Sequence, residues 1–298
     1  MSNVLTELSA ALATAVSQAD SGIVRVEGRR RLAATGIVWN SAGLILTANH
    51  VVRHEEHLKV GLPDGSRVSA SLVGRDPSTD LAVLKVDGSG LSPLTESNKQ
   101  DLGVGNLVLA LGRPGRTVQA TLGIVSALGD SWRTRLGGNI DRYLQTDVVM
   151  YPGFSGGPLV DAAGQLIGLN TSALGRGVSL TIPTPTLARV ADALQAHGRM
   201  QRGYLGVSTQ RVHLPDDLKA ELEQKRGLLV VSVENDSPAA KAGLTLGDTL
   251  VAFAGSPVQS HDDLLALLAG EVVGTAVPLK FVRGGKVHTT EVTVTARP

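Results

Sequence analysis

The chain has 298 residues, 42% of them hydrophobic and only 3% aromatic, so it can form two domains whose cores rest on aliphatic side chains. Its 28 Lys and Arg residues nearly balance its 27 Asp and Glu residues, so the net charge does not indicate a nucleic-acid-binding protein. There is no cysteine, which excludes a thiol nucleophile, a thiolate metal site and disulfides.

The first predicted element is a helix over residues 3–18, within an N-terminal helical segment that we place at 1–20. Apolar side chains recur along it at helical spacing, namely Val4, Leu5, Leu8, Leu12, Ala15 and Val16. Its polar face carries no Lys or Arg, so we expect it to dock on protein rather than on a membrane surface. We expect no signal peptide and no membrane span, because no leader pattern and no run of about 18 apolar residues is present.

Residues 21–183 form the first predicted domain, in which short apolar runs alternate with Gly, Pro, Asn and Asp. The runs lie at 22–26, 35–39, 44–47, 58–62, 68–73, 81–86, 107–111, 120–127, 144–146, 159–160 and 166–170. Many short strands separated by turn signals predict an all-β sandwich or barrel, and a pair of barrels fits their number.

Residues 184–202 are predicted to connect two domains through a helix. Leu187, Val190 and Leu194 recur at helical spacing, with Thr184 as the predicted N-cap and Gly198 after the last turn.

Residues 203–298 form the second predicted domain, because strands return there and now alternate with helices. Strands are expected at 228–233 and 249–253, and a hairpin at 276–283 and 286–295. A short helix is expected after Ser237 and an amphipathic one at 260–269, which together predict a compact α+β module.

Three residues suggest nucleophilic catalysis. Ser155 stands in a glycine-rich turn, His50 follows an apolar run, and Asp80 directly precedes another. A serine hydroxyl needs a base to become a nucleophile, and neighbouring glycines let backbone N–H groups converge on an oxyanion. The chain order His, Asp, Ser is that of chymotrypsin. Each residue alone also has a non-catalytic interpretation, as a turn serine, a strand-end histidine or a turn-capping aspartate.

The segments around these residues, 47–52, 76–85 and 145–159, resemble the catalytic blocks of the HtrA (Deg) family of serine proteases. The motif at 204–207 and the Ser-Pro-Ala at 237–239 resemble that family's PDZ domain. The resemblance implies a mainly β protein with a chymotrypsin-like double β-barrel protease domain followed by an α+β PDZ domain. It implies an ATP-independent serine endopeptidase of protein quality control and stress response, which cleaves unfolded or misfolded proteins and responds to C-terminal peptides at the PDZ domain.

The resemblance also implies roles for single residues. Ser155 would be the nucleophile, His50 the general base and acid, and Asp80 the residue that orients His50. The oxyanion hole would comprise Gly153, Phe154 and Ser155, with the N–H groups of Gly153 and Ser155 as donors.

Further residues are implied to bind substrate and peptide. Met150 would line the pocket for the P1 side chain, favouring small or medium aliphatic residues. Val178, Ser179 and Leu180 would pair with the substrate backbone. The carboxylate of a C-terminal peptide would sit on backbone N–H groups of Tyr204, Leu205, Gly206 and Val207.

The sequence departs from the family pattern next to the nucleophile. Phe154 stands where family members usually have Asn, and Tyr151-Pro152 stands where Asn-Pro is common. The segment 129–143 aligns with the family loop that relays PDZ occupancy to the active site. Its arginines are candidates for pairing with acidic groups, and a plain solvated loop is the alternative.

Other expectations concern partners, cofactors and location. We expect no cofactor and no metal, because the strand before His50 breaks the helix on which His50, His54 and His57 would share a face. The resemblance favours a homotrimer or a multiple of it. The rival function is a peptide-binding holdase, chaperone or scaffold with a weakly active or inactive barrel. A cytoplasmic location follows if Met1 is the native start, and a periplasmic or cell-envelope location if the chain is a trimmed piece.

Overall fold

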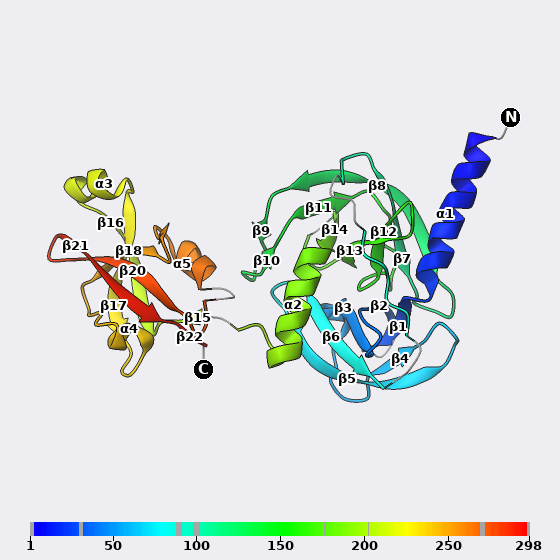
Figure 1. Ribbon diagram of the computed structural model, residues 1–298, viewed down its shortest axis with the longest axis horizontal. Coiled ribbons are helices and arrows are strands. Elements are labelled where there is room, and N and C mark those ends of the chain that lie inside the picture. The colour runs from blue at the N-terminus through cyan, green and yellow to red at the C-terminus, as the bar shows by residue number, and fades with distance from the viewer. Residues whose placement is uncertain are drawn as a thin grey trace. The chain divides into compact units, whose positions relative to one another are not determined.

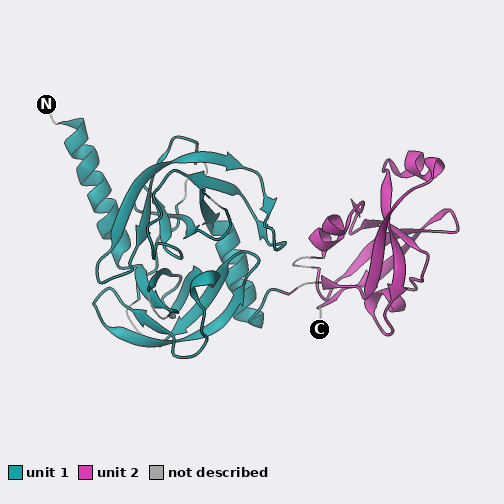
Figure 2. Cartoon of the chain, turned by 180° about the vertical axis from the view of Figure 1, so that it is seen from behind, with its two compact units in different colours: residues 1–200 teal, residues 201–298 magenta. Residues whose placement is uncertain are grey.

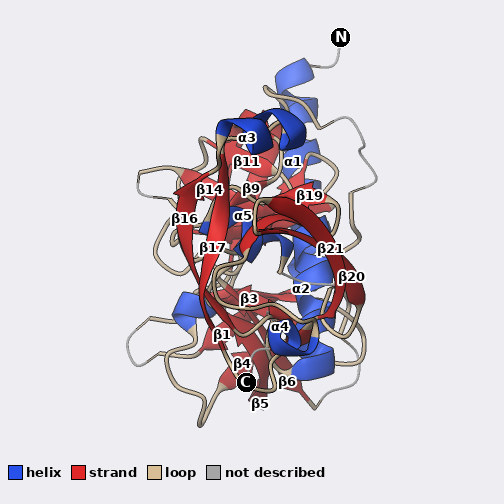
Figure 3. Cartoon of the chain, turned by 90° about the vertical axis from the view of Figure 1, so that its left-hand side faces the viewer, coloured by secondary structure: helices blue, strands red, loops and turns tan. Residues whose placement is uncertain are grey.

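The computed structural model describes residues 3–29, 32–87, 91–97, 102–175, 177–201, 203–268 and 272–296. The chain divides into two compact units, residues 1–200 and residues 201–298 (Figure 2). Strands dominate both units, which confirms the predicted mainly β fold (Figure 3). Among the described residues, no helix combines the length and apolar character needed to cross a membrane.

Two closed six-stranded barrels make up most of the first unit, as predicted (Figure 1). The first closes in the order β1-β2-β3-β6-β5-β4 and the second in the order β11-β14-β13-β12-β7-β8. The first barrel contains β1 (Ile23–Glu27), β2 (Ala34–Val38), β3 (Leu44–Ala48), β4 (Lys59–Gly61), β5 (Arg67–Asp76) and β6 (Leu81–Val86). The second contains β7 (Leu107–Gly112), β8 (Gln119–Gly129), β11 (Tyr143–Thr146), β12 (Pro158–Asp161), β13 (Leu166–Thr171) and β14 (Ser179–Pro183).

The N-terminal helix α1 (Val4–Asp20) docks by only its second half. Ala15 and Ala19 are buried in a cluster that includes residues of β1, β7 and β12. The first turn projects away from the barrels (Figure 1), and the side chains of Val4 and Leu5 are 74% and 73% exposed. The predicted apolar stripe therefore has a covered half and an open half.

Helix α2 (Thr184–His197) packs on the first unit through the predicted residues Leu187, Val190 and Leu194, which are buried in the core of the first barrel. The predicted capping role of Thr184 is wrong: the N-cap position is Pro183, with no side-chain cap. Pro183 ends β14 in an extended conformation, so the chain turns directly from strand into helix. Gly198 ends the helix in a left-handed conformation, as predicted (φ 70°).

The second unit is built around a sheet in the order β16-β17-β18-β20-β21. Its strands are β16 (Val207–His213), β17 (Arg226–Val233), β18 (Thr249–Phe253), β20 (Ala276–Arg283) and β21 (Lys286–Thr293), with the short β15 (Gly203–Tyr204), β19 (Ser256–Pro257) and β22 (Thr295–Ala296). Its helices are α3 (Asp216–Leu222), α4 (Pro238–Lys241) and α5 (His261–Leu267). Gly284 and Gly285 both have positive φ, as the predicted tight hairpin turn between β20 and β21 requires.

Asp248 connects the core strand β18 to the hairpin of the second unit. Its two carboxylate oxygens each accept a hydrogen bond from Arg283 at 2.7 Å, and the N–H of Thr245 donates at 2.7 Å. Burial opposes ionisation, but the bonds from Arg283 and Thr245 outweigh it and hold the pKa of Asp248 below its usual value. Because this pKa is lower in the folded state, the carboxylate's stabilising effect is complete above the unfolded pKa and is lost as pH falls through the folded pKa.

We therefore expect Asp248→Asn to lower the free energy of unfolding of this unit by about 2–3 kcal/mol at neutral pH. Native-state hydrogen exchange of the full chain, read on peptides of β18 and β20, measures this change. The exposed Asp217→Asn should leave it unaltered. The difference between Asp248→Asn and the parent should shrink in acid, and a difference that persists unchanged at low pH would contradict the assignment.

Candidate active site

The candidate catalytic His and Asp lie at one end of the first barrel, next to the ends of two neighbouring strands. His50 belongs to the short helix η1 (Asn49–Val51), which follows β3, and Asp80 directly precedes β6. The antiparallel strands pair Ala48 with Leu81, so their register brings the two residues together. Nδ1 of His50 lies 2.8 Å from Oδ2 of Asp80, and the backbone N–H of His50 donates to Oδ1 at 2.9 Å.

Asp80 is buried and tightly held. Besides the two contacts with His50, its Oδ2 accepts a short hydrogen bond from Oγ1 of Thr171, and its carbonyl accepts from the N–H of Asn49. Its backbone is left-handed (φ 58°), which aspartate tolerates better than most residues. A buried carboxylate with donors on both oxygens keeps one orientation, so it can fix the tautomer and direction of the imidazole.

Two adjacent residues at the end of β13 connect the two barrels at this point. Thr171 donates to Asp80 of the first barrel, and Oγ of Ser172 lies 3.1 Å from Oγ of Ser155 in the second. The three predicted catalytic residues are therefore brought to one place. In the described part of the chain, no hydrogen bond joins Ser155 to His50, a contact that is often long without substrate. Our sequence reasoning missed Thr171 and Ser172, whose only signal is their polarity after an apolar strand.

Ser155 follows a type II turn. The N–H of Phe154 donates to the carbonyl of Tyr151 at 3.0 Å, and Gly153 has φ 96°. A type II turn needs positive φ at its third residue, which favours glycine, and Pro152 suits its second position. The local sequence Tyr151-Pro152-Gly153-Phe154 thus matches the conformation that it adopts.

A second type II turn begins where the first ends, and it carries the serine. The N–H of Gly157 donates to the carbonyl of Phe154 at 2.8 Å, and Gly156 has φ 88°. A Cβ on Gly156 would meet the carbonyl oxygen of Thr35 at 2.2 Å, so only glycine fits. Ser155 therefore sits at the second position of a turn packed against the first barrel, and it is 8% exposed.

The backbone N–H groups on either side of Phe154 are unpaired. Those of Gly153 and Ser155 have no acceptor among the described residues, whereas the N–H of Phe154 is paired with Tyr151. The carbonyl of Gly153 accepts from Oγ1 of Thr35 at 2.7 Å. The two donors predicted for the oxyanion hole are thus left without a partner in the part of the chain that the structure describes.

Comparisons with known proteins agree with this geometry. The trypsin-like peptidase domain family matches residues 34–169, and the PDZ domain family matches residues 203–294. Two solved structures match closely in fold: the HtrA-type protease AlgW with a decapeptide (TM-score 0.75, 30% identity, 96% of this chain and 99% of that one) and the serine endoprotease from Yersinia pestis (TM-score 0.74, 31%, 96% and 98%). The chain belongs to the HtrA family of serine proteases.

Curated HtrA relatives include a probable periplasmic serine endoprotease, DegP-like, from Pseudomonas fluorescens, which is 38% identical over 270 residues. A protein of the same description from Chlamydia trachomatis is 37% identical over 280 residues. The matched regions cover 89% and 92% of this chain but 56% of each relative. This HtrA chain therefore spans about half the length of the curated relatives that it matches.

The predicted substrate-binding residues of this HtrA chain lie in the second barrel. Met150 packs against the barrel core, and Ser179 donates from Oγ to the carbonyl of Val148 at 2.9 Å. Val178 and Leu180 flank Gly175, whose Cβ would meet their side chains at 2.5 and 3.0 Å. Their roles toward substrate stay predictions.

The predicted carboxylate-binding loop of the HtrA PDZ domain also carries unpaired N–H groups. The carbonyls of Leu205 and Gly206 accept from Ala239 and Glu234, whereas the N–H groups of Leu205 and Gly206 have no acceptor among the described residues. Gly206 has φ 76°, and a Cβ there would lie 2.2 Å from Cβ of Ser237. Tyr204 donates a short hydrogen bond from its hydroxyl to Glu234.

The strand that follows this loop, β16, is an edge strand of the described sheet. Helix α5 lies beside it, since Nε2 of His261 is 2.9 Å from the carbonyl oxygen of Thr209. A peptide can add to a sheet edge of this kind as an extra strand.

The segment 129–143, predicted as a loop, forms a small hairpin of β9 (Trp132–Arg133) and β10 (Asn139–Ile140). Oγ1 of Thr134 donates to the carbonyl of Ser78 at 2.6 Å, and a Cβ on Gly138 would lie 2.4 Å from the same oxygen. The hairpin thus packs on the turn that leads into Asp80.

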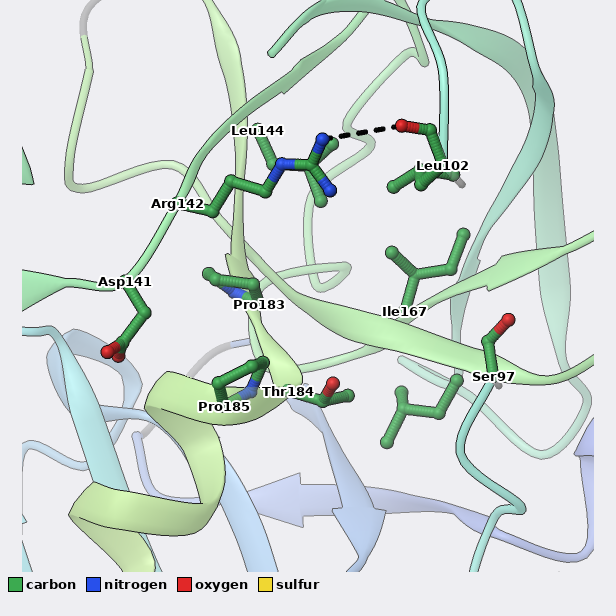
Figure 4. A pocket seen from close by; sticks show the side chains of 10 residues that line it. Ser97, Leu102, Asp141, Arg142, Leu144, Ile167, Pro183, Thr184 and Pro185 are labelled. Carbon is green, nitrogen blue, oxygen red and sulfur yellow. Dashed lines mark hydrogen bonds between the residues drawn. The ribbon is translucent and has the colours of Figure 1, made fainter. Parts of the chain in front are cut away.

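A cavity of about 470 Å³ lies at the start of α2 (Figure 4). Its lining includes Leu102, Asp141, Arg142 and Ile167, and the guanidinium of Arg142 donates to the carbonyl of Leu102 at 3.4 Å. None of the predicted catalytic or substrate-binding residues lines it. The candidate active site is therefore separate from this cavity.

Proposed function

We propose that the chain is a serine endopeptidase, with Ser155 as nucleophile, His50 as general base and Asp80 as the residue that orients His50. The observation that carries this proposal is that Asp80 contacts both His50 and Thr171, while Ser172, the next residue along the chain, contacts Ser155. Because Asp80 accepts from Nδ1 of the imidazole, Nε2 remains an acceptor for the serine proton. Rotation of the Ser155 hydroxyl from Ser172 toward His50 begins the attack on the substrate carbonyl.

The tetrahedral intermediate would place its oxyanion on the unpaired N–H groups of Gly153 and Ser155. Each preorganised donor of this type is worth about 10²–10³ in kcat. His50 then returns the proton to the leaving amine, and water, activated by the same imidazole, hydrolyses the acyl-enzyme.

The proposed substrates are unfolded or misfolded polypeptides, cleaved without ATP in protein quality control. An extended substrate would pair with the strand at Val178, Ser179 and Leu180, and Met150 would contact the P1 side chain. The apolar character of Met150 and Leu180 favours small or medium aliphatic P1 residues.

Labelling with a fluorophosphonate tests the enzyme proposal directly. The reagent phosphonylates an activated serine, so the purified full chain should gain one adduct, which peptide mass spectrometry should locate on Ser155. Absence of an adduct, or an adduct on Ser172, would refute the assignment. An adduct on Ser155 would also decide against the rival holdase function, which the resting contact between Ser155 and Ser172 favours.

The PDZ domain is proposed to bind C-terminal peptides between β16 and α5, with the peptide carboxylate on the N–H groups of Leu205 and Gly206. The HtrA-type protease AlgW was solved with a decapeptide, which supports peptide binding by a protein of this fold. Amidating an apolar peptide should weaken its binding by about tenfold or more, because charge-assisted hydrogen bonds are lost. Fluorescence anisotropy with the full chain carrying Ser155→Ala measures this without cleavage. Gly206→Ala should abolish binding, and equal affinity for both peptide forms would exclude the carboxylate site.

Peptide binding is proposed to regulate proteolysis through the hairpin at 129–143. The contacts of Thr134 and Gly138 with Ser78 support this route, because Ser78 lies in the turn that leads into Asp80. Turnover of a small chromogenic substrate should rise with a PDZ-binding peptide in the parent, and Gly138→Ala should abolish that response. If the peptide leaves turnover of the parent unchanged, the PDZ domain only tethers substrates.

We also propose an assembly state and a cellular location for the chain. The open half of the α1 stripe, Val4, Leu5 and Leu8, supports a trimer or a multiple of it. A light-scattering mass near 30.9 kDa across micromolar concentrations would contradict this. The names of the curated relatives support the periplasm or cell envelope over the cytoplasm, and cell fractionation distinguishes these locations.

A further inference from the structure

Phe154, the residue before the candidate nucleophile, is fully buried. Its ring belongs to the core of the second barrel, together with Val108, Ala110, Val125, Leu144, Val148, Leu159 and Ile167. The ring also lies against the backbone of Gly112, where a Cβ would meet ring atoms at 2.6–2.9 Å. Gly112 thus provides the space that this aromatic side chain occupies.

Phe154 also closes the turn that carries Gly153. Its ring meets that of Tyr151 edge-to-face, with centroids 5.8 Å apart and planes at 79°. Tyr151 and Phe154 are the first and last residues of the turn, and they are joined by a backbone hydrogen bond as well. The buried ring therefore ties the end of the turn to the barrel core.

Two consecutive peptide units of this turn differ in their hydrogen bonds. The unit between Gly153 and Phe154 is held at its carbonyl by Thr35 and at its N–H by Tyr151. By contrast, neither the carbonyl nor the N–H of the unit between Pro152 and Gly153 has a partner among the described residues. Rotation of that unit converts a type II turn into type I and exchanges the Gly153 N–H for the Pro152 carbonyl. Such a rotation would remove one donor of the oxyanion hole.

We propose that Phe154, seated against Gly112, is a positioning residue that keeps this turn closed in its type II form. The inference rests on the proposed peptidase function. With the turn anchored to the core, Gly153 stays at positive φ and its N–H remains presented to the oxyanion without any bound ligand.

Substitutions at both contact partners test the proposal. Phe154→Ala and Gly112→Ala should each lower kcat for a small chromogenic substrate by about 10²-fold, the effect of one oxyanion donor, with little change in KM. The affinity of a peptidyl boronate, which mimics the tetrahedral intermediate, should fall in parallel with kcat/KM. Val125→Ala, a truncation in the same core, should destabilise the barrel but keep the kcat of the parent.

A compensating pair separates positioning from general damage. Leu is smaller than Phe, so Phe154→Leu leaves room for the Cβ of Gly112→Ala, and the double variant should recover at least about tenfold in kcat over Gly112→Ala. A double variant worse than both single ones would overturn the proposal, as would full kcat in folded Phe154→Ala. If Phe154→Ala does not fold, the Gly112→Ala and double variants decide the outcome. Failure of the parent to react with fluorophosphonate would instead refute the peptidase function.

Discussion

Replacing Ser155 with alanine is expected to lower kcat for an unfolded substrate by about 10⁶-fold, because the acyl-enzyme can no longer form. The unpaired N–H groups of Gly153 and Ser155 remain, so a small residual rate above that of water should persist. Steady-state cleavage of an unfolded protein measures the loss, and an unchanged thermal melting curve of the protease unit confirms that the variant is folded.

Ser172 offers the matched control, since its hydroxyl is 3.1 Å from that of Ser155 and its side chain is as small. Ser172→Ala should keep kcat within about tenfold of the parent, because the imidazole and the oxyanion donors are untouched. Activity in Ser155→Ala within about tenfold of the parent would show that another residue is the nucleophile.

Asp80→Asn should lower kcat by about 10⁴-fold while the fold is kept. An asparagine amide at this position can donate to Nδ1 of His50, which leaves the proton on Nε2, where the serine proton must go. The backbone N–H of His50 donates to Oδ1, which becomes the amide oxygen. The hydroxyl of Thr171, which donates to Oδ2 in the parent, can rotate and accept from the amide NH2 instead. We therefore expect a large fall in kcat and little change in the melting temperature.

Asp76 gives the control for this change. It is buried in the same turn and accepts from Ser78 and Thr79, but it does not contact the imidazole. Asp76→Asn should lower the melting temperature yet preserve most of kcat. Equal losses of kcat in the two variants would mean that Asp80 acts by supporting the turn and has no direct effect on His50.

The candidate active site has two sides with different supports. The turn proposed to carry the oxyanion donors ends at Phe154, whose side chain is buried in the core of the second barrel. Asp80 lies in a turn of the first barrel that contacts the hairpin at 129–143 through Ser78. The proposed regulation by PDZ peptides therefore concerns the Asp80 side, and the proposed anchoring concerns the other.

The sequence by itself determined the features that depend on local chemistry. The apolar runs predicted the barrel strands, and 81–86 and 249–253 match β6 and β18 at both ends. The glycine-rich turn expected at Ser155 is present, and the helix expected at 260–269 forms as α5, which Ser260 caps. These predictions succeed because turn, cap and strand preferences act between residues close in the chain. Helix α3 was missed because it is short and polar and has one buried residue, Leu218.

Only the tertiary structure decided which of these elements meet. Thr171 donates to Asp80 across 91 positions of sequence, and Thr35 holds the carbonyl of Gly153 across 118. The burial of Phe154 against Gly112 and the docking of only half of α1 were likewise beyond the sequence pattern. The physical reason is that apolar spacing shows which face of an element is covered, whereas the covering residues depend on strand register and on how the two barrels pack.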